Sequence, residues 1–165
     1  MSIGLFPATH DEDALVSSLS QAHPTLFYTV VEQSSVAISL TGPDARIVYA
    51  NQAFCQLTGY RRDELLGQDH RILASQQTPR ELYPQMWHNL AQGQPWSGQL
   101  INRKRDHSLY LAEVSISPIV DRHGRLEHYL AMHKDISDRY ALEQRLRNNF
   151  SLITSVLNNI PVAVV

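Results

Sequence analysis

The amino-acid sequence of 165 residues predicts an α+β domain: a five-stranded antiparallel sheet with short helices on one face and further helices flanking it at both ends. Three observations favour this fold class. Residues 36–51 read as two β-rich runs around the turn sequence TGPDA. Residues 52–93 hold several short helical patterns that end at glycines. Strand-like runs then follow at Trp96–Lys104, Leu109–Ile119 and Leu126–Ile136, and their links are short enough for antiparallel neighbours.

The first helical segments begin and end at recognisable capping residues. Residues 25–34 (TLFYTVVEQS) are an expected helix ahead of the first two strands. Asn51 is expected to cap the helix in NQAFCQLTG, and Gly59 to end it. A second short helix, in YRRDELLGQ, is expected to end at Gly67.

The segment before the last three strands predicts one longer helix. Residues 70–77 (HRILASQQ) carry no regular pattern. In the stretch TPRELYPQMWHNLAQG that follows, Thr78 is the expected N-terminal cap, Pro79 the first helical residue and Gly93 the end.

One polar residue falls on the apolar face of a predicted strand. By the period of two, Asn102 shares a face with Trp96, Gly98 and Leu100. A buried amide needs hydrogen-bond partners, and either the hairpin itself or a ligand supplies them.

The C-terminal part of the chain has a heptad pattern that begins after Ser137. Apolar residues and one asparagine recur at spacings of four and three until Pro161 ends the pattern. The positions of this seam are Leu142, Leu146, Asn149, Ile153, Val156 and Ile160. The pattern favours a dimerising signalling helix, with a plain amphipathic linker helix as the alternative.

These patterns divide the chain into four segments. Residues 1–23 are an expected N-terminal cap or flexible segment, with a short helix at Asp11–Leu19. Residues 24–136 form the globular domain and residues 137–160 the signalling or linker helix. Residues 161–165 continue an apolar run, which is typical of the start of a following domain.

Composition excludes several classes of function. Hydrophobic residues make up 43% and charged residues 18% of the chain, as in globular domains. The net charge of −2 does not indicate the positively charged surface that nucleic-acid-binding domains usually have. The single cysteine, Cys55, excludes an internal disulfide framework, and the eight histidines show no familiar metal spacing. We find no catalytic motif, secretory signal or membrane span, so we expect a cytoplasmic protein that is not itself an enzyme.

Three segments of the sequence resemble the PAS family of sensor domains. They read YANQAFCQLTGYRRDELLG, PWSGQLINRKRDHSLYLAEVSISPI and YLAMHKDISDR, and the similarity spans residues 26–139. More narrowly, PWSGQLINRKRD, LYLAEV and MHKDIS resemble the flavin-binding first PAS domain of NifL-type regulators of nitrogen fixation. This resemblance implies the PAS fold and noncovalently bound FAD, with FMN the less favoured flavin.

The resemblance also implies a function and partners. In such regulators oxygen oxidises the reduced flavin, and the redox state passes to an output domain or to a transcriptional activator of the NifA type. We expect a homodimer through the terminal helices, and no direct contact with nucleic acid or membrane.

Residue by residue, the resemblance implies several cofactor contacts. Asn102 matches the amide that hydrogen-bonds the polar edge of the flavin ring. Ser39 lies on the first predicted strand, from which its hydroxyl is expected to reach the same edge. His133 stands where light-oxygen-voltage domains, a PAS subfamily, carry a glutamine that senses flavin N5. In GQDHRIL, His70 takes the place of their adduct-forming cysteine, which excludes that photochemistry, and Arg71 matches an arginine that pairs with cofactor phosphate.

Trp87 is expected to stack near the dinucleotide, on the same helix as Tyr83. The remaining residues expected around the cofactor are Thr78, Pro79, Tyr110 and Met132.

Three alternatives stay open at this level. The first is a light-responsive flavin domain on a sensor histidine kinase. The second is a haem-binding gas sensor ligated through His88 on the long helix. The third is a cofactor-free dimerisation module, which the heptad seam alone would satisfy.

Overall fold

A computed structural model describes residues 23–159 and shows one antiparallel sheet with the strand order β2-β1-β5-β4-β3. In chain order the elements are α2 (Pro24–Gln33), β1 (Ala37–Thr41), β2 (Ile47–Ala50), α3 (Gln52–Thr58), α4 (Arg62–Leu65), the 3₁₀ helix η1 (His70–Leu73), α5 (Leu82–Ala91), β3 (Trp96–Arg103), β4 (Leu109–Val120), β5 (Leu126–Asp135) and α6 (Ser137–Asn158). The predicted α+β class and the five strands are confirmed. The expectations for Asp11–Leu19, Ile160, Pro161 and residues 161–165 lie outside the described residues.

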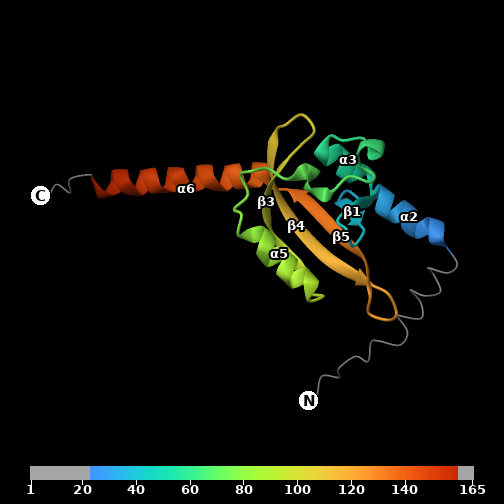
Figure 1. Cartoon of the computed structure of the whole chain (residues 1–165). Coiled ribbons are helices and arrows are strands. Elements are labelled where there is room, and N and C mark those ends of the chain that lie inside the picture. Colours follow the sequence, from blue (N-terminus) through green and yellow to red (C-terminus); the bar gives the residue numbers. More distant parts are fainter. Residues whose placement is uncertain (1–22, 160–165) are drawn as a thin grey trace, which may run out of the picture.

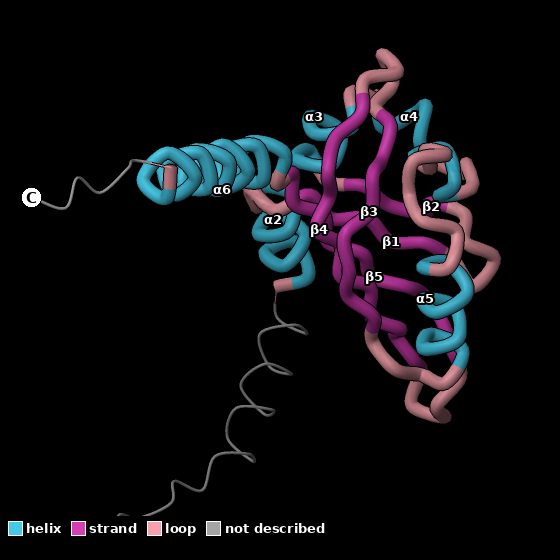
Figure 2. The backbone as a smooth tube through the Cα atoms, turned by 90° about the vertical axis from the view of Figure 1, so that its left-hand side faces the viewer, coloured by secondary structure: helices cyan, strands magenta, loops and turns pink. Residues whose placement is uncertain are grey.

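The core lies between one face of the sheet and the short helices. One apolar cluster joins α5, through Met86 and Leu90, to the inner faces of β3, β4 and β5. A second cluster packs Phe54 of α3 and Leu65 of α4 against β1 and β2. Figures 1 and 2 show α5 beside the sheet and α6 extending away from it. The domain therefore has a covered face and a more open one.

Asn51 fastens three elements at the edge of this core. Its side chain is completely buried. The amide oxygen accepts hydrogen bonds from the backbone N–H groups of Ile38 (2.9 Å) and Phe54 (3.0 Å), and the latter bond is the predicted cap of α3. The amide nitrogen donates to the carbonyl groups of Val31 and Val36, both at 2.9 Å. One side chain thus links α2, β1 and α3.

Glycines end the helices where the sequence predicts. Gly59 (φ 78°) closes α3 in the left-handed conformation, and Gly67 (φ 81°) and Gly93 (φ 72°) follow α4 and α5 in the same conformation. Such φ values favour glycine because it has no Cβ atom.

The predicted start of the long helix is wrong. α5 begins at Leu82, so Pro79 lies outside it and Thr78 does not cap it. The Thr78 hydroxyl instead accepts from the backbone N–H of Ile101 (2.9 Å) and donates to the Ile101 carbonyl (3.0 Å). The pattern for residues 70–77 also missed the 3₁₀ turn of η1. Tertiary hydrogen bonds from this segment to Ile101 of β3 therefore determine its conformation.

α6 begins at Ser137, as predicted, and its first residue is held by the sheet. The Ser137 hydroxyl accepts from the backbone N–H of Leu111 (2.9 Å), and the Asp135 carboxylate accepts from the Ser137 N–H (2.9 Å). No residue of α6 is buried. Within residues 23–159, no helix has the length and apolar character needed to cross a membrane.

We expect Asn51→Ala to lower the free energy of unfolding by about 3 kcal/mol, because it leaves four buried or part-buried backbone groups without their partner. Urea unfolding followed by circular dichroism measures the loss. Asn148→Ala, at an exposed position on α6, should change stability by less than about 0.5 kcal/mol. Equal stability losses in the two variants would contradict the role of Asn51.

Candidate functional site

A cavity of about 650 Å³ lies between the inner face of the sheet and the segments formed by η1 and α5. Most of its wall is apolar or aromatic, and a few polar side chains reach it. The polar lining residues are Thr41, Asp44, Asp69, His70, Arg71, Tyr83, Asn102 and His133. The apolar and aromatic ones include Leu73, Met86, Trp87, Leu90, Leu100, Val114, Ile116, Tyr129 and Ala131. This size and composition are typical of a small-molecule pocket.

The sheet side of the cavity follows the alternation of the strands. Asn102 is only 3% exposed and lies on the same face as Trp96 and Leu100, so the prediction from the period of two is confirmed. A bridge between Asn102 and Ala74 brings the segment after η1 against this end of β3. The amide therefore reaches the cavity from its sheet wall.

His133 is the least satisfied polar group at the site. Its side chain is buried, and neither ring nitrogen has a hydrogen-bond partner among the described residues. The ring packs edge-on against Phe54 (5.2 Å between centroids) and stacks with His70 (5.4 Å, 26°). Burial lowers the pKa of His133 to about 3, and the nearby His70 acts in the same direction. The imidazole is neutral at pH 7, so it carries one donor and one acceptor.

His70 joins this buried pair from η1. Its Nε2 atom lies 3.3 Å from the hydroxyl oxygen of Ser39, which is itself completely buried on β1. Burial lowers the pKa of His70 to about 4, against an opposing contribution from Asp69. Ser39 therefore contacts His70 and is not itself a lining residue of the cavity.

Arg71 and Trp87 lie where the cavity opens. The Arg71 side chain is largely exposed and forms two hydrogen bonds with Asp69, Nη2 to Oδ2 at 3.0 Å and Nε to Oδ1 at 3.2 Å. Trp87 remains 42% exposed and meets Tyr129 edge-on, with 5.9 Å between ring centroids. Both side chains can contact a ligand that extends out of the cavity.

Besides Ser39, four of the expected site residues do not line this cavity. Thr78 bonds Ile101, and Pro79 precedes α5. Tyr110 is buried next to Asn102 on the neighbouring strand, and its hydroxyl has no partner among the described residues. Met132 lies on the opposite face of the sheet because its neighbour His133 faces inward.

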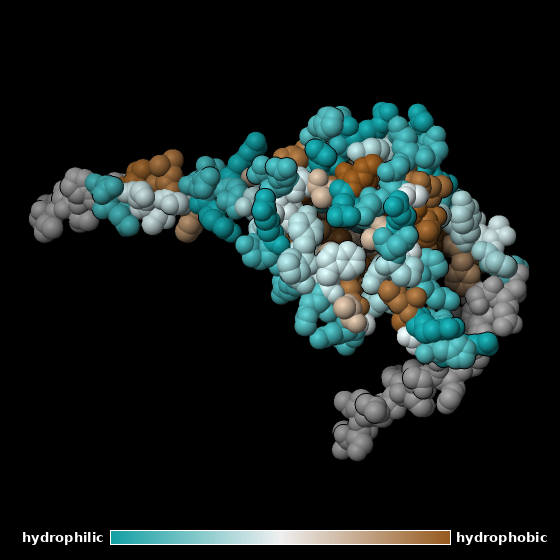
Figure 3. All heavy atoms as spheres, viewed as in Figure 1, coloured by the Kyte–Doolittle hydropathy of each residue, from teal (hydrophilic) through white to brown (hydrophobic). Residues whose placement is uncertain are grey.

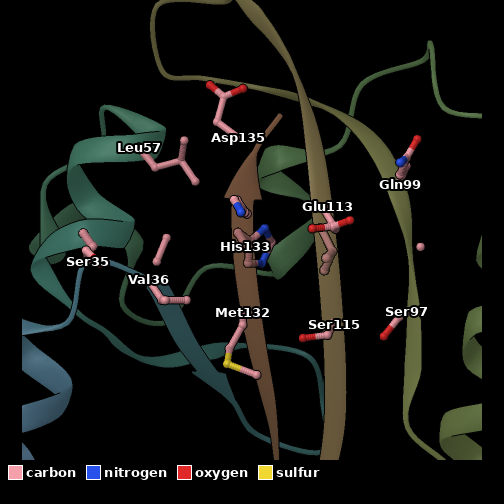
Figure 4. A pocket seen from close by; sticks show the side chains of 15 residues that line it. Ser35, Val36, Leu57, Ser97, Gln99, Glu113, Ser115, Met132, His133 and Asp135 are labelled. Atoms are coloured by element: carbon pink, nitrogen blue, oxygen red, sulfur yellow. The ribbon is translucent and has the colours of Figure 1, made fainter. Parts of the chain in front are cut away.

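Figure 4 shows a second hollow, of about 980 Å³, lined on the open face of the sheet by Met132, Ser115 and Ser97. These three residues are register partners on β5, β4 and β3. The hollow is bordered by α3 through Ala53 and Leu57, whereas residues of η1 and α5 enclose the cavity around Asn102. We therefore take the cavity as the candidate site.

Sequence reasoning missed several residues of the cavity wall. Met86 and Leu90 are two of them. They share one face of α5 with Tyr83 and the expected Trp87, and this helical spacing was the signal for the inward side of the helix. Tyr129 shares the inward face of β5 with Ala131 and His133. Only the fold shows that these two faces enclose the same space.

We expect the free energy of unfolding to fall as the pH falls from 6.5 to 5. The unfolded chain protonates its histidines near pH 6.5, whereas folded His133 and His70 do so only near pH 3 and 4. The unfolded state then holds more protons, and each histidine contributes about 1 kcal/mol per pH unit. His133→Gln should reduce this slope by about that amount in urea unfolding experiments.

His88→Gln is the matched control, because His88 is exposed on α5 and outside the cavity. This variant should keep the wild-type slope. The same slope in His133→Gln and in wild type would contradict a neutral, buried His133.

Solved structures with the same fold contain light-oxygen-voltage domains. An RNA-binding light-oxygen-voltage receptor superposes with a TM-score of 0.72 and 25% identity, over 94% of this chain and 42% of that one. A light-oxygen-voltage domain from a study of its mechanism with a flavin analogue has a TM-score of 0.61 and 27% identity, over 84% and 95% of the two chains.

A curated relative is much more similar in sequence. The nitrogen fixation regulatory protein of Klebsiella oxytoca is 59% identical over 153 residues, which are 93% of this chain and 31% of that protein. The resemblance to regulators of nitrogen fixation is thereby confirmed. The family model described as PAS fold matches residues 25–136. The chain belongs to the PAS-domain family.

Proposed function

We propose that this domain binds a flavin, senses redox state or oxygen through it, and relays that state through α6. The observation that carries the proposal is the pair of unpartnered ring nitrogens on buried His133 in a cavity that Asn102 also lines. Buried polar groups normally have partners, and a bound ring with polar edges would supply them. The flavin-analogue structure of a light-oxygen-voltage domain supports the same class of ligand.

The residues present fit a flavin. The apolar walls from α5 and the sheet suit a flat aromatic ring, and a 650 Å³ cavity is within the range of cofactor pockets. The Asn102 amide can both donate to and accept from the polar edge of such a ring. Bound flavin would supply reversible redox chemistry, with oxygen as the oxidant.

His133 suits a reporting role because it is neutral. A neutral imidazole can present either a donor or an acceptor to the same partner by changing tautomer. The ring can therefore accept a hydrogen bond from a protonated partner and donate one to an unprotonated partner. Neither arrangement requires a charged imidazole in the buried site. The stacked His70, held near Ser39, limits the rotation of the ring.

The route from His133 to α6 is short. His133 lies on β5 two residues before Asp135, whose carboxylate accepts from the N–H of Ser137 at the start of α6. The same Asp135 lies 3.7 Å from the Lys104 ammonium at the end of β3. A shift of β5 would therefore reach the base of the helix directly.

The dinucleotide FAD is the favoured flavin because the mouth of the cavity offers Trp87. Its indole is partly exposed and is suited to stacking with an adenine. Arg71 can pair with a phosphate if it exchanges its contact with Asp69. His88, the haem ligand considered from the sequence, is exposed and does not line the cavity.

α6 is the proposed dimerisation element. The described seam residues are all exposed, and Figure 3 shows apolar side chains along the surface of this helix. They are Leu142, Leu146, Asn149, Ile153 and Val156. In a homodimer of NifL-like organisation, α6 would pass the state of the site to an output domain or to a NifA-type activator in the cytoplasm.

We expect the purified domain to show a two-banded flavin absorption spectrum that bleaches with dithionite and returns in air. Asn102→Ala should weaken FAD binding about tenfold or more, because a buried hydrogen bond to the ring is lost. Fluorescence titration of the apoprotein measures the dissociation constant. Gln99→Ala, on the same strand but on the open face, is the control and should bind as wild type.

Two outcomes would refute flavin binding at this site: a single intense Soret band, or no visible absorbance even after incubation with FAD. The first would indicate haem, and the second a cofactor-free dimerisation module.

We also expect hydrogen exchange at the first turns of α6 to differ between the air-oxidised and the dithionite-reduced protein. His133→Ala should abolish that difference, because β5 then lacks the side chain that reports the state of the site. Met132→Ala, its neighbour on the opposite face, should retain the difference. An unchanged redox response in His133→Ala would rule out this route.

A further inference from the structure

Tyr83 brings an unexplained hydroxyl to the helix side of the cavity. It lies on the first turn of α5, three residues before Met86 and four before Trp87, on the face that lines the cavity. Its ring packs against the apolar cluster of α5 and the sheet. Its hydroxyl oxygen is buried and has no hydrogen-bond partner among the described residues.

Packing alone does not account for this hydroxyl. A buried hydroxyl without a partner is destabilising, and phenylalanine would fill the same space without that penalty. Two other buried hydroxyls near the site have protein contacts, since Thr78 bonds Ile101 and Ser39 lies beside His70. The Tyr110 hydroxyl also has no partner among the described residues, but Tyr110 does not line the cavity. The neighbours of Tyr83 along the face of α5, Met86 and Leu90, are apolar.

We propose that Tyr83 donates a hydrogen bond to an oxygen atom of the bound flavin, and so positions it from the helix side. This inference rests on the proposed function. A flavin has carbonyl oxygens on its ring and hydroxyl oxygens on its ribityl chain, and a phenol is a donor to both. Asn102 approaches from the sheet wall and Tyr83 from the opposite wall, so together they fix both the depth and the tilt of the ligand.

The test is Tyr83→Phe, measured in the apoprotein and with flavin. We expect FAD and riboflavin to bind about three- to tenfold more weakly, which is the effect of one neutral hydrogen bond. The visible absorption bands should shift if a ring oxygen is the acceptor. Lumiflavin, which lacks the ribityl chain, separates the two acceptors: its affinity falls only if the acceptor lies on the ring.

The apoprotein gives the second readout. Because Tyr83→Phe removes a hydroxyl without a protein partner, the melting temperature of the apoprotein should stay the same or rise. The stabilisation by saturating FAD should become smaller. Tyr60→Phe is the control: Tyr60 is half-buried, packs against the cluster around Phe54 and does not line the cavity. It should change neither readout.

Other outcomes overturn the proposal separately. Unchanged flavin affinity and spectrum in Tyr83→Phe would refute the role of Tyr83 and leave flavin binding intact. A destabilised apoprotein with unchanged flavin affinity would assign the hydroxyl to a structural water. Wild-type protein that binds no flavin would refute the proposed function and this inference together.

Discussion

The buried amide of Asn51 is the constraint on which the geometry of the site depends. Its four hydrogen bonds fix the end of α2, the start of β1 and the first turn of α3 relative to one another. α3 in turn carries Phe54, whose ring packs against both His70 and His133. A satisfied polar network of this kind specifies one arrangement where apolar packing alone would tolerate several. The position of the buried histidines therefore follows from a structural asparagine outside the cavity.

The polar groups of two pairs of residues are used in different ways, and the buried Tyr110 hydroxyl and Arg62 Nε, outside the cavity, belong to neither pair. Those of Asn51 and Thr78 are fully used within the protein, and they hold segments together. Those of His133 and Tyr83 are buried without protein partners at the wall of one cavity. Departures from complete hydrogen bonding are expected at functional sites, because there a ligand completes them.

β5 connects the site to the start of α6. It is the central strand of the sheet, it carries His133 on its inner face, and it ends at Asp135, whose carboxylate accepts from the N–H of Ser137 at the start of α6. The first residue of α6 is also held by β4 through Leu111 and Ser137. Beyond that point the helix has no buried residue, so the apolar seam of α6 is exposed along its described length.

The sequence by itself determined the strands, the caps at Asn51 and Gly59 and the burial of Asn102, because these depend on local periodicity and backbone preference. Its segments also identified the family. Only the tertiary structure decided that Thr78 bonds β3 instead of capping α5, because propensity at one residue yields to a long-range hydrogen bond. It likewise decided that His70 stacks on His133 and that Tyr83 faces Asn102 across one cavity, since these residues meet through folding and not through spacing.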